Sequence, residues 1–437
     1  MKRIFPDFAY GDGPRAGCWW DETVAPVEHP VLRGDVRCDV AIVGAGFTGL
    51  SAALTLARAG ASVVVLDANR AGWGASGRNG GFCCLGGGMA SDASLDRRFG
   101  RAGRLEWRRA EVAAVAYVGQ LAASLGLDID RHSQGETCVL HKPGLLPVFE
   151  GEAARIEENY GVVPTFLGAD QMRDAGMAGP FHGAMTIPVG FGLNPGKLLC
   201  GVLSAALSAG AQIYDQSPAT RVAGTTVETP GGRVHADRVI VSTNGYSSED
   251  IPAAMAARYM PAQSTVLVTR PITAQERAQQ GWTSDQMAYD SRNLLHYFRL
   301  MPDGRFLFGM RGGLRSSPAA EDAARRALMR DFRAMFPEWA GVDVTHCWSG
   351  MVCLARNLLP FVGALPGQSG VLAGFAYHGN GVAMGMFSGS ILADLALGRA
   401  PALYPQAMRT PARRFPFGAA RRIVMPPVYA ALNVLDR

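Results

Sequence analysis

The chain has 437 residues, of which 48% are hydrophobic and 18% are charged, and its formal net charge is +5. This composition is typical of a globular protein with a large core, and the scattered arginines form no basic stripe of the kind that binds nucleic acid. The eight cysteines lack paired CxxC spacing, so we expect no metal site and reduced thiols in a cytoplasmic protein. The apolar runs are too short for a signal peptide or a transmembrane helix.

The first motif begins with a short apolar strand, Val40–Val43, followed at once by the sequence GAGFTG. Gly44 permits a tight turn, Gly46 lets a diphosphate approach the backbone, and Gly49 lets the next helix pack on the strand. Leu50–Gly60 has helical spacing and ends in a glycine. The helix N-terminus offers free N–H groups and a partial positive charge to an anion.

A second strand, Ser62–Leu66, leads into Asp67, which lies 18 residues after Gly49. An acid at this place can accept hydrogen bonds from a ribose diol. The order of strand, glycine motif, helix, strand and acid therefore predicts a dinucleotide site. The acid favours FAD or NAD over NADP.

A glycine-rich loop, Gly72–Gly81, follows with the sequence GWGASGRNGG. A pure NAD site leaves this loop unexplained. Its small residues would let the backbone approach a second bulky group, and Arg78 and Asn79 supply directed donors for a diphosphate or a flavin edge. The alternative is a surface loop that exposes its arginine.

With these motifs the sequence resembles the D-amino-acid-oxidase-like (DAO) FAD-dependent oxidoreductases, and most closely their γ-glutamylputrescine oxidoreductase branch. The blocks that carry the resemblance stand in family order and include VAIVGAGFTGLSAALTLARAG, VVVLDANRAGWGASGRNGG, VIVSTNGYSS, HYFRLMPDGRFLFG, WSGMVCLARNLLPFVG and AYHGNGVAMG. The resemblance implies an α/β protein, α+β overall, with a Rossmann-like FAD-binding domain and an interleaved antiparallel-sheet substrate domain.

The implied domains are discontinuous. We expect the FAD-binding domain to comprise residues 36–95, 190–262 and 346–437, and the substrate domain to comprise residues 96–189 and 263–345. Residues 1–35 are expected to form an N-terminal extension that packs on the FAD-binding domain.

The resemblance also implies which residues contact FAD, which we expect to bind without a covalent link. They lie in the glycine motif, the acid that follows, the glycine-rich loop, the strand end near 244 and the turn before the last long helix. In chain order they are Gly44, Gly46, Phe47, Thr48, Gly49, Asp67, Ala68, Gly74, Ala75, Ser76, Arg78, Asn79, Gly80, Ala219, Asn244, Gly245, Gly379, Asn380, Gly381 and Val382.

Ser291–Gly309 has the pattern of a β-hairpin, with a turn signal at Asp303–Gly304. The period of two puts Tyr297 and Arg299 on one face. In the resembled family this region covers the flavin, so we assign these two residues, with His378, as candidate catalytic residues. The alternative places Tyr297 in the core and Arg299 in solvent.

The implied reaction is oxidation of an amine, with hydride transfer to flavin N5 and hydrolysis of the resulting imine to an aldehyde. The substrate would be a γ-glutamylputrescine-like amine, a polyamine or a secondary amine, and the electron acceptor O₂ or a quinone. Two alternatives stay open: a D-amino acid or N-methyl amino acid dehydrogenase or oxidase, and a catalytically idle flavoprotein subunit. An NAD-dependent dehydrogenase would leave the glycine-rich loop without a role.

The chain departs from the family pattern at three places. Amino-acid oxidases of the family have a carboxylate-binding arginine two residues after the Trp-x-Gly block, where this chain has Val352. Arg299 or Arg356 could bind a carboxylate from another direction. Some relatives in the resembled family position a lysine over the flavin for oxygen activation, but none of the three lysines of this chain lies in the hairpin or the C-terminal blocks. The resemblance therefore does not predict oxidase activity over dehydrogenase activity. Cys353 lies near the region where some relatives attach flavin, but the matching position is Gly350.

Overall fold

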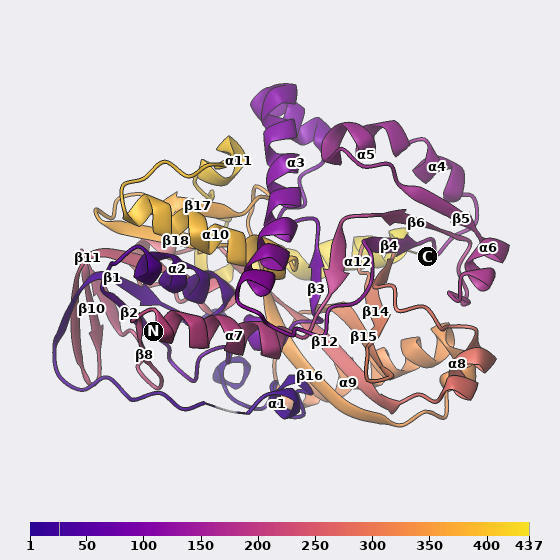
Figure 1. Ribbon diagram of the computed structural model, residues 1–437, viewed down its shortest axis with the longest axis horizontal. Helices are drawn as coiled ribbons and strands as arrows, with labels where there is room; N and C mark the ends of the chain where they lie inside the picture. The colour runs from indigo at the N-terminus through magenta and orange to yellow at the C-terminus, as the bar shows by residue number, and fades with distance from the viewer. Residues whose placement is uncertain (26, 437) are drawn as a thin grey trace.

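Two eight-stranded sheets dominate the computed structural model, which describes residues 1–25 and 27–436 (Figure 1). The first sheet has the order β17-β18-β11-β1-β2-β8, with β9 and β10 paired beside β11. The pairs from β18 to β8 run parallel, whereas β17 is antiparallel to β18, β10 to β11 and β9 to β10. The strands are β1 (Val36–Val43), β2 (Val63–Leu66), β8 (Gln212–Tyr214), β9 (Arg221–Ala223), β10 (Thr226–Thr229), β11 (Gly232–Val241), β17 (Phe361–Ala364) and β18 (Val371–Phe375).

This sheet is buried on both faces, which explains the unbroken apolar sequence of its strands. Val40 and Ile42 of β1 pack into the cluster made with the helices, whereas Ala41 and Val43 pack into a second cluster on the opposite face. The covering helices include α2 (Phe47–Arg58), α7 (Pro195–Ser208) and α10 (Gly381–Ala396). The predicted strand, helix and strand that begin this domain are confirmed.

The second sheet has the order β16-β12-β15-β14-β13-β4-β6-β5 and is antiparallel except between β13 and β4. Between the two large sheets lies a short pair, β3 and β7. The strands are β3 (Phe82–Cys84), β4 (Glu136–Val139), β5 (Thr165–Gly168), β6 (Gly183–Ile187), β7 (Gly190–Gly192), β12 (Met260–Pro271), β13 (Ala288–Asp290), β14 (His296–Leu300), β15 (Arg305–Gly313) and β16 (Val344–Leu354).

The predicted hairpin is confirmed as β14 and β15, which pair in antiparallel register around the turn at Asp303–Gly304. Phe298 points into an aromatic cluster that covers one face of this sheet. Tyr297 and Arg299 lie on the other face, against the glycine-rich loop. The alternation of β14 therefore sends one set of side chains to the core and the other toward the first sheet.

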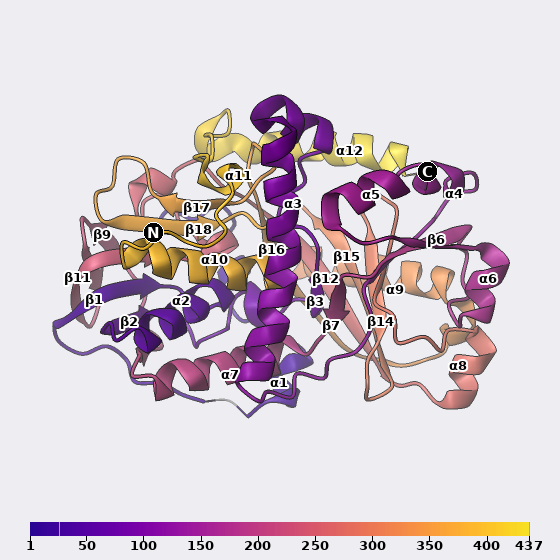
Figure 2. The same ribbon diagram turned by 45° about the horizontal axis from the view of Figure 1, so that its top comes forward.

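The chain passes repeatedly between the two sheets, so the fold is an interleaved α/β structure with a Rossmann-like half. The long strands β12 and β16 lie side by side across the expected domain limits at 262 and 346. Helix α3 (Asp92–Ser124) lies between the two halves (Figure 2). The other helices of four residues or more are α1 (Trp20–Thr23), α4 (Leu146–Glu150), α5 (Ala153–Tyr160), α6 (Ala169–Asp174), α8 (Ala274–Gln280), α9 (Pro318–Met335), α11 (Gln406–Arg409) and α12 (Met425–Leu435).

Helix α12 links the two halves at the end of the chain (Figure 2). Just before it, the buried Arg421 forms an ion pair with Glu249 on the side of the first sheet. Just after it, the Asp436 carboxylate accepts hydrogen bonds from the backbone N–H groups of Asn293 and Leu294, in the loop that leads into β14. Within the described residues, no helix has the length and hydropathy needed to cross a membrane.

We predict that Gly49→Ala destabilises the protein by about 3 kcal/mol or more, because an added Cβ has no room in a packed interior. That Cβ would lie 1.9 Å from the carbonyl oxygen of Gly44. Denaturant unfolding followed by circular dichroism measures the effect. Gly341→Ala is the control, since a Cβ at this exposed glycine meets no atom within 4 Å, and its effect should stay within about 0.5 kcal/mol. Equal unfolding midpoints for the two variants would contradict the prediction.

Candidate functional site

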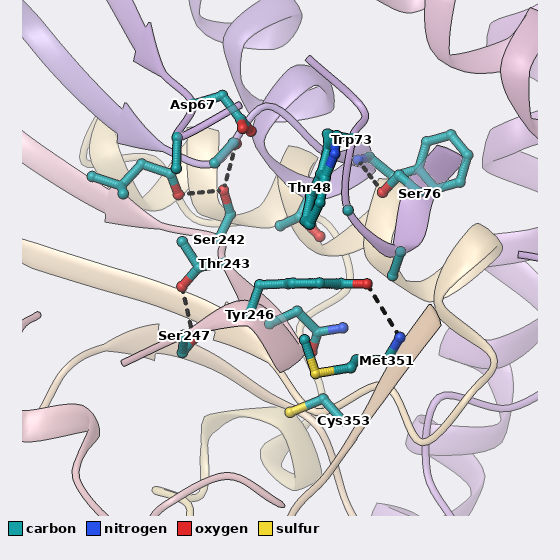
Figure 3. A pocket seen from close by; sticks show the side chains of 18 of the residues that line it. Thr48, Asp67, Trp73, Ser76, Ser242, Thr243, Tyr246, Ser247, Met351 and Cys353 are labelled. Atoms are coloured by element: carbon teal, nitrogen blue, oxygen red, sulfur yellow. Dashed lines mark hydrogen bonds between the residues drawn. The ribbon is translucent and has the colours of Figure 1, made fainter. Parts of the chain in front are cut away.

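A cavity with an empty volume of about 1390 Å³ opens at the carboxyl ends of β1, β2 and β11 (Figure 3). This is the end of a parallel sheet at which doubly wound folds bind nucleotides. The first turn of α2 forms one wall through Gly46, Phe47 and Thr48. Its N-terminal N–H groups have no intrahelical partner, so they offer hydrogen bonds and a partial positive charge to an anion in the cavity.

The glycine motif has the geometry that its sequence predicts. Gly44 has a positive φ of 106°, and a Cβ there would lie 3.1 Å from the Ser242 carbonyl oxygen. A Cβ on Gly46 would lie 2.9 Å from Oγ of Ser76, the atom that accepts a hydrogen bond from the Phe47 N–H. Only glycine fits these places without displacing its neighbours.

Asp67 lies at the end of β2 and lines the same cavity. Its Oδ2 accepts a hydrogen bond from the Ala45 N–H, and its Oδ1 accepts one from the Asn69 N–H, each at 2.9 Å. Burial raises the pKa of this carboxyl to about 6, against the opposing effect of the two N–H donors. The carboxylate is thus held in place by backbone groups and can accept further hydrogen bonds from a ribose.

The glycine-rich loop uses its carbonyl groups inside the protein. Each carbonyl oxygen from Gly72 to Gly81 accepts a hydrogen bond from another protein group. By contrast, the N–H groups of Gly74, Ala75 and Ser76 have no hydrogen-bond partner among the described residues, and all three residues line the cavity. The loop therefore presents donors, not acceptors, to whatever binds there, which suits a diphosphate.

Asn79 and Arg78 shape this loop in different ways. The Asn79 amide donates hydrogen bonds to the carbonyl oxygens of Ala75 and Ser76, and its Oδ1 accepts one from the Gly81 N–H. Arg78 is 2% exposed, and its guanidinium stacks 3.9 Å from the centroid of the Trp73 ring. Its Nη2 is buried with no hydrogen-bond partner among the described residues, so one donor of the loop arginine is left over for a ligand.

The N-terminal segment 12–20 binds the loop from the outside. Arg15 Nη1 donates to the carbonyl oxygen of Trp73, the Cys18 thiol to that of Gly77, and the Trp20 indole N–H to that of Asn79. The Trp73 indole in turn donates to the Asp12 carboxylate at 2.9 Å. These contacts fix the loop from behind and leave its inner side to the cavity.

A second cavity, with an empty volume of about 1360 Å³, adjoins the first. The two share lining residues, among them Ala75, Met351 and Gly379. The second cavity lies between the glycine-rich loop and the face of β14 and β15 that carries Tyr297. The Tyr297 hydroxyl is 2.9 Å from Oγ of Ser264, and burial raises the pKa of this phenol.

Arg311 on β15 enters the second cavity at the end shared with the first. Its Nη2 donates to Oδ1 of Asn380 at 3.1 Å, and a Cβ on Gly379 would lie 2.8 Å from the same nitrogen. Among the described residues, no carboxylate lies within salt-bridge distance of Arg311. Burial lowers the pKa of this guanidinium, and a buried cation without a counter-ion favours an anionic ligand.

The other end of the second cavity is lined by acids and phenols. Glu136 accepts hydrogen bonds from the Leu85 N–H at 3.0 Å and from the Tyr289 hydroxyl at 3.4 Å. Burial raises its pKa to about 8. Glu111 is also buried and pairs with Arg108 at 2.8 Å. The second cavity thus has a cationic end at Arg311 and a carboxyl-rich end, where Arg108 also lines the wall and already balances the charge of Glu111.

Most of the residues assigned from sequence line one of the two cavities. The first is lined by Gly44, Gly46, Phe47, Thr48, Asp67, Ala68, Gly74, Ala75, Ser76, Asn79, Ala219, Asn244, Gly379, Gly381 and Val382. The second is lined by Arg78, Gly80, Tyr297 and Asn380, and again by Ala75, Asn79, Gly379 and Val382. Gly49 and Gly245 lie behind these walls, where Gly49 allows the close approach of α2 to the Gly44 carbonyl.

Two of the three residues assigned as catalytic do not reach either cavity. Arg299 is 1% exposed and donates to the carbonyl oxygens of Gly80 and Leu193 and to the His132 ring. His378 is 3% exposed, with its two ring nitrogens bonded to the Gly87 carbonyl and the Ala355 N–H. Burial lowers the pKa of His378 to about 4. Both side chains brace the backbone and line neither cavity, which gives no support to the catalytic role predicted for them.

Arg311 was missed because the hairpin was read only as far as Gly309. Tyr297 pairs with Gly309 across the hairpin, so continuing the same period of two along β15 places Arg311 on the Tyr297 face. Arg356, the other arginine considered for a carboxylate, instead donates to the carbonyl oxygen of Arg414 at the surface. Glu136 carried no sequence signal beyond its place in a short strand.

We predict that Glu136→Gln stabilises the protein at alkaline pH. The carboxyl pKa is raised from 4.5 to about 8, so between these values the folded chain holds a proton that the unfolded chain has lost. Stability from this group therefore falls as pH rises toward 8. The melting temperature of Glu136→Gln should exceed that of the wild type at pH 9, and the gap should shrink toward pH 5.

The control for this measurement is Glu338→Gln, because Glu338 is exposed and its substitution should leave the pH profile of the melting temperature unchanged. A difference between Glu136→Gln and the wild type that is constant from pH 5 to pH 9 would show that Glu136 does not titrate as proposed.

Comparison with known proteins agrees with this geometry. The DAO family, described as FAD dependent oxidoreductase, matches residues 39–395. The chain is 32% identical over 397 residues to the probable oxidoreductase OrdL of Rhizobium meliloti (strain 1021), covering 88% of this chain and 89% of that protein. It is 29% identical over 400 residues to the gamma-glutamylputrescine oxidoreductase of Escherichia coli (strain K12), covering 90% and 91%.

Solved structures show the same fold. The crystal structure of glycine oxidase from Geobacillus kaustophilus superposes with a TM-score of 0.72 at 19% sequence identity, covering 86% of this chain and 99% of that one. The iminodiacetate oxidase of Chelativorans sp. BNC1 superposes with a TM-score of 0.69 at 20% identity, covering 84% and 98%. The chain belongs to the DAO family of FAD-dependent oxidoreductases.

Proposed function

We propose that this enzyme oxidises the C–N bond of an amine that also carries a carboxylate. When bound, FAD would supply the acceptor for a hydride from the carbon next to the amine nitrogen, and water would hydrolyse the resulting imine to a carbonyl compound and ammonia or a smaller amine. FAD would occupy the first cavity, where its diphosphate suits the donors of α2 and of the glycine-rich loop. The substrate would occupy the second cavity.

The observation that carries the proposal is the guanidinium of Arg311. It lies in the second cavity, next to the shared wall, with the Asn380 side chain as its only side-chain partner among the described residues. A guanidinium binds a carboxylate in a directed, bidentate way. Arg311 therefore takes the place of the arginine that the Trp-x-Gly block lacks, approaching from β15 in place of β16. A polyamine without a carboxylate would leave this cation unpaired.

The carboxyl-rich end of the cavity suits a second, cationic group of the substrate. Glu136 would hold a proton near pH 7 in the free enzyme because its pKa is about 8. An ammonium group bound beside it would favour the ionised carboxylate. γ-Glutamylputrescine, after which the Escherichia coli relative is named, carries a carboxylate and amines at separate positions and so matches both ends.

A second candidate is an amino acid whose amine and carboxylate share one carbon, such as a D-amino acid or an N-methyl amino acid. The closeness of Arg311 to Gly379 supports it, because Gly379 lines both cavities. A carboxylate held there would leave the adjacent C–N bond beside the shared wall. Both candidates require Arg311. They differ in whether a group of the substrate binds at the carboxyl-rich end of the second cavity.

The chain's other residues would position and shield the reacting groups. The first turn of α10 lies at Gly381 and Val382 on the wall of the first cavity, where its N–H groups favour negative charge. Tyr297 and Ser264 would orient the substrate through their hydroxyl groups. None of the described lysines lines either cavity, so the choice between O₂ and a quinone as electron acceptor rests on experiment.

The proposal is tested by anaerobic bleaching of the flavin absorbance. γ-Glutamylputrescine, a D-amino acid or an N-methyl amino acid should reduce the flavin at least tenfold faster than putrescine, which has no carboxylate, at equal concentration. Failure of every amine to bleach the flavin would contradict the proposal, as would a faster rate with putrescine. Repeating the reaction in air and measuring H₂O₂ decides between an oxidase and a dehydrogenase.

We predict that Arg311→Ala raises KM for the carboxylate-bearing substrate by about tenfold to a hundredfold, the loss expected for a charge-assisted hydrogen bond. The reaction with putrescine should change little, because that amine has no group for Arg311 to bind. Arg315→Ala is the matched control, since Arg315 is exposed and lines neither cavity. Equal KM values for the Arg311 and Arg315 variants would contradict the proposal that Arg311 binds a carboxylate of the substrate.

A further inference from the structure

The first ten residues lie over the dinucleotide cavity. Met1, Arg3 and Tyr10 line it, together with the glycine motif and Asp67. This segment comes before the first strand and is separate from the segment 12–20 that binds the glycine-rich loop from outside.

Several contacts hold this segment in place. The Lys2 N–H donates to Oδ1 of Asp250 at 2.7 Å, and the Lys2 carbonyl accepts a hydrogen bond from the Glu249 N–H at 2.8 Å. The terminal ammonium lies 3.6 Å from Oδ2 of Asp250. Phe5 is 3% exposed and packs beneath the Arg422 guanidinium at 3.6 Å. The anchors are a small buried cluster, in which Phe5, Ala9 and Tyr10 pack against Met351, and the half-buried Asp250 carboxylate. None of the ten residues belongs to a strand, so the segment can open without unfolding the sheet behind it.

Arg3 is the cation of this wall. Its guanidinium stacks 4.3 Å from the centroid of the Tyr10 ring, and Tyr10 packs edge-on against Tyr246 at 6.3 Å. Its Nε is buried with no hydrogen-bond partner, and no carboxylate pairs with it among the described residues. Its one side-chain hydrogen bond among the described residues is a weak one, from Nη2 to the Met1 sulfur at 3.6 Å.

We propose that residues 1–10 form a latch over the bound FAD and that Arg3 supplies a cationic contact to its diphosphate. The diphosphate is the anionic part of FAD, and Arg3 is a cation of the cavity wall that lacks a protein acid. The latch must open for the cofactor to enter or leave. It therefore governs the rate of FAD exchange as well as the affinity.

The test measures FAD binding and does not depend on any amine substrate. Apoprotein is titrated with FAD, and FAD release from holoenzyme is followed by the rise in flavin fluorescence. Arg3→Ala should raise Kd by about tenfold to a hundredfold and speed release. Arg3→Lys should recover part of the affinity. Asp250→Asn should speed both binding and release, because it weakens one anchor of the latch and leaves Arg3 intact.

Arg33→Ala is the matched control, since Arg33 lies in the same extension but is exposed and lines neither cavity. Thermal melts of the apoproteins confirm that each variant is folded. A Kd for Arg3→Ala within twofold of that for Arg33→Ala would overturn the proposal, and so would an Arg3→Lys variant as weak as Arg3→Ala. A wild-type protein that binds FAD but oxidises no amine would refute the proposed function and leave the latch intact.

Discussion

The shape of the first cavity depends on the hydrogen bonds that hold the glycine-rich loop, residues 72–81. Its carbonyl groups face inward to donors from three distant parts of the chain, exemplified by Trp20, Arg299 and Trp348. A peptide group whose oxygen is satisfied on one side turns its N–H to the other, and here the N–H groups of Gly74 to Ser76 face the first cavity. The donors that face the first cavity are thus presented by a loop whose shape is supported by distant parts of the chain.

The same loop joins the two halves of the fold. Tyr297 of β14 lies so close to it that a Cβ on Gly80 would stand 2.7 Å from the ring, and Gly309 on β15 leaves room for the ring on the other side. The guanidinium of Arg299 crosses from the second sheet to the Gly80 carbonyl. The spacing of the first and second cavities is therefore set by contacts between these side chains and the backbone of the loop.

The sequence predicted the local elements well and the roles of buried polar side chains poorly. The glycine motif, Asp67 and the hairpin follow from short-range rules of turn geometry and alternation, and each is found where those rules place it. Arg299 and Arg311 lie on the same face of the hairpin, yet one bonds carbonyl groups behind the loop and the other enters the cavity. That difference depends on the depth at which the sheet meets the loop, which is a property of the whole fold.

The walls of the two cavities come from different stretches of chain. The carboxyl-rich end of the second cavity is built from α3, α5, β4 and β13, none of which touches the first cavity. Substitutions in these segments can change which molecule the second cavity accepts, because they leave the lining of the first cavity unaltered. A related protein with a different substrate would differ mainly in residues 108–160 and near 289. The same stretches can be randomised to engineer a new substrate specificity.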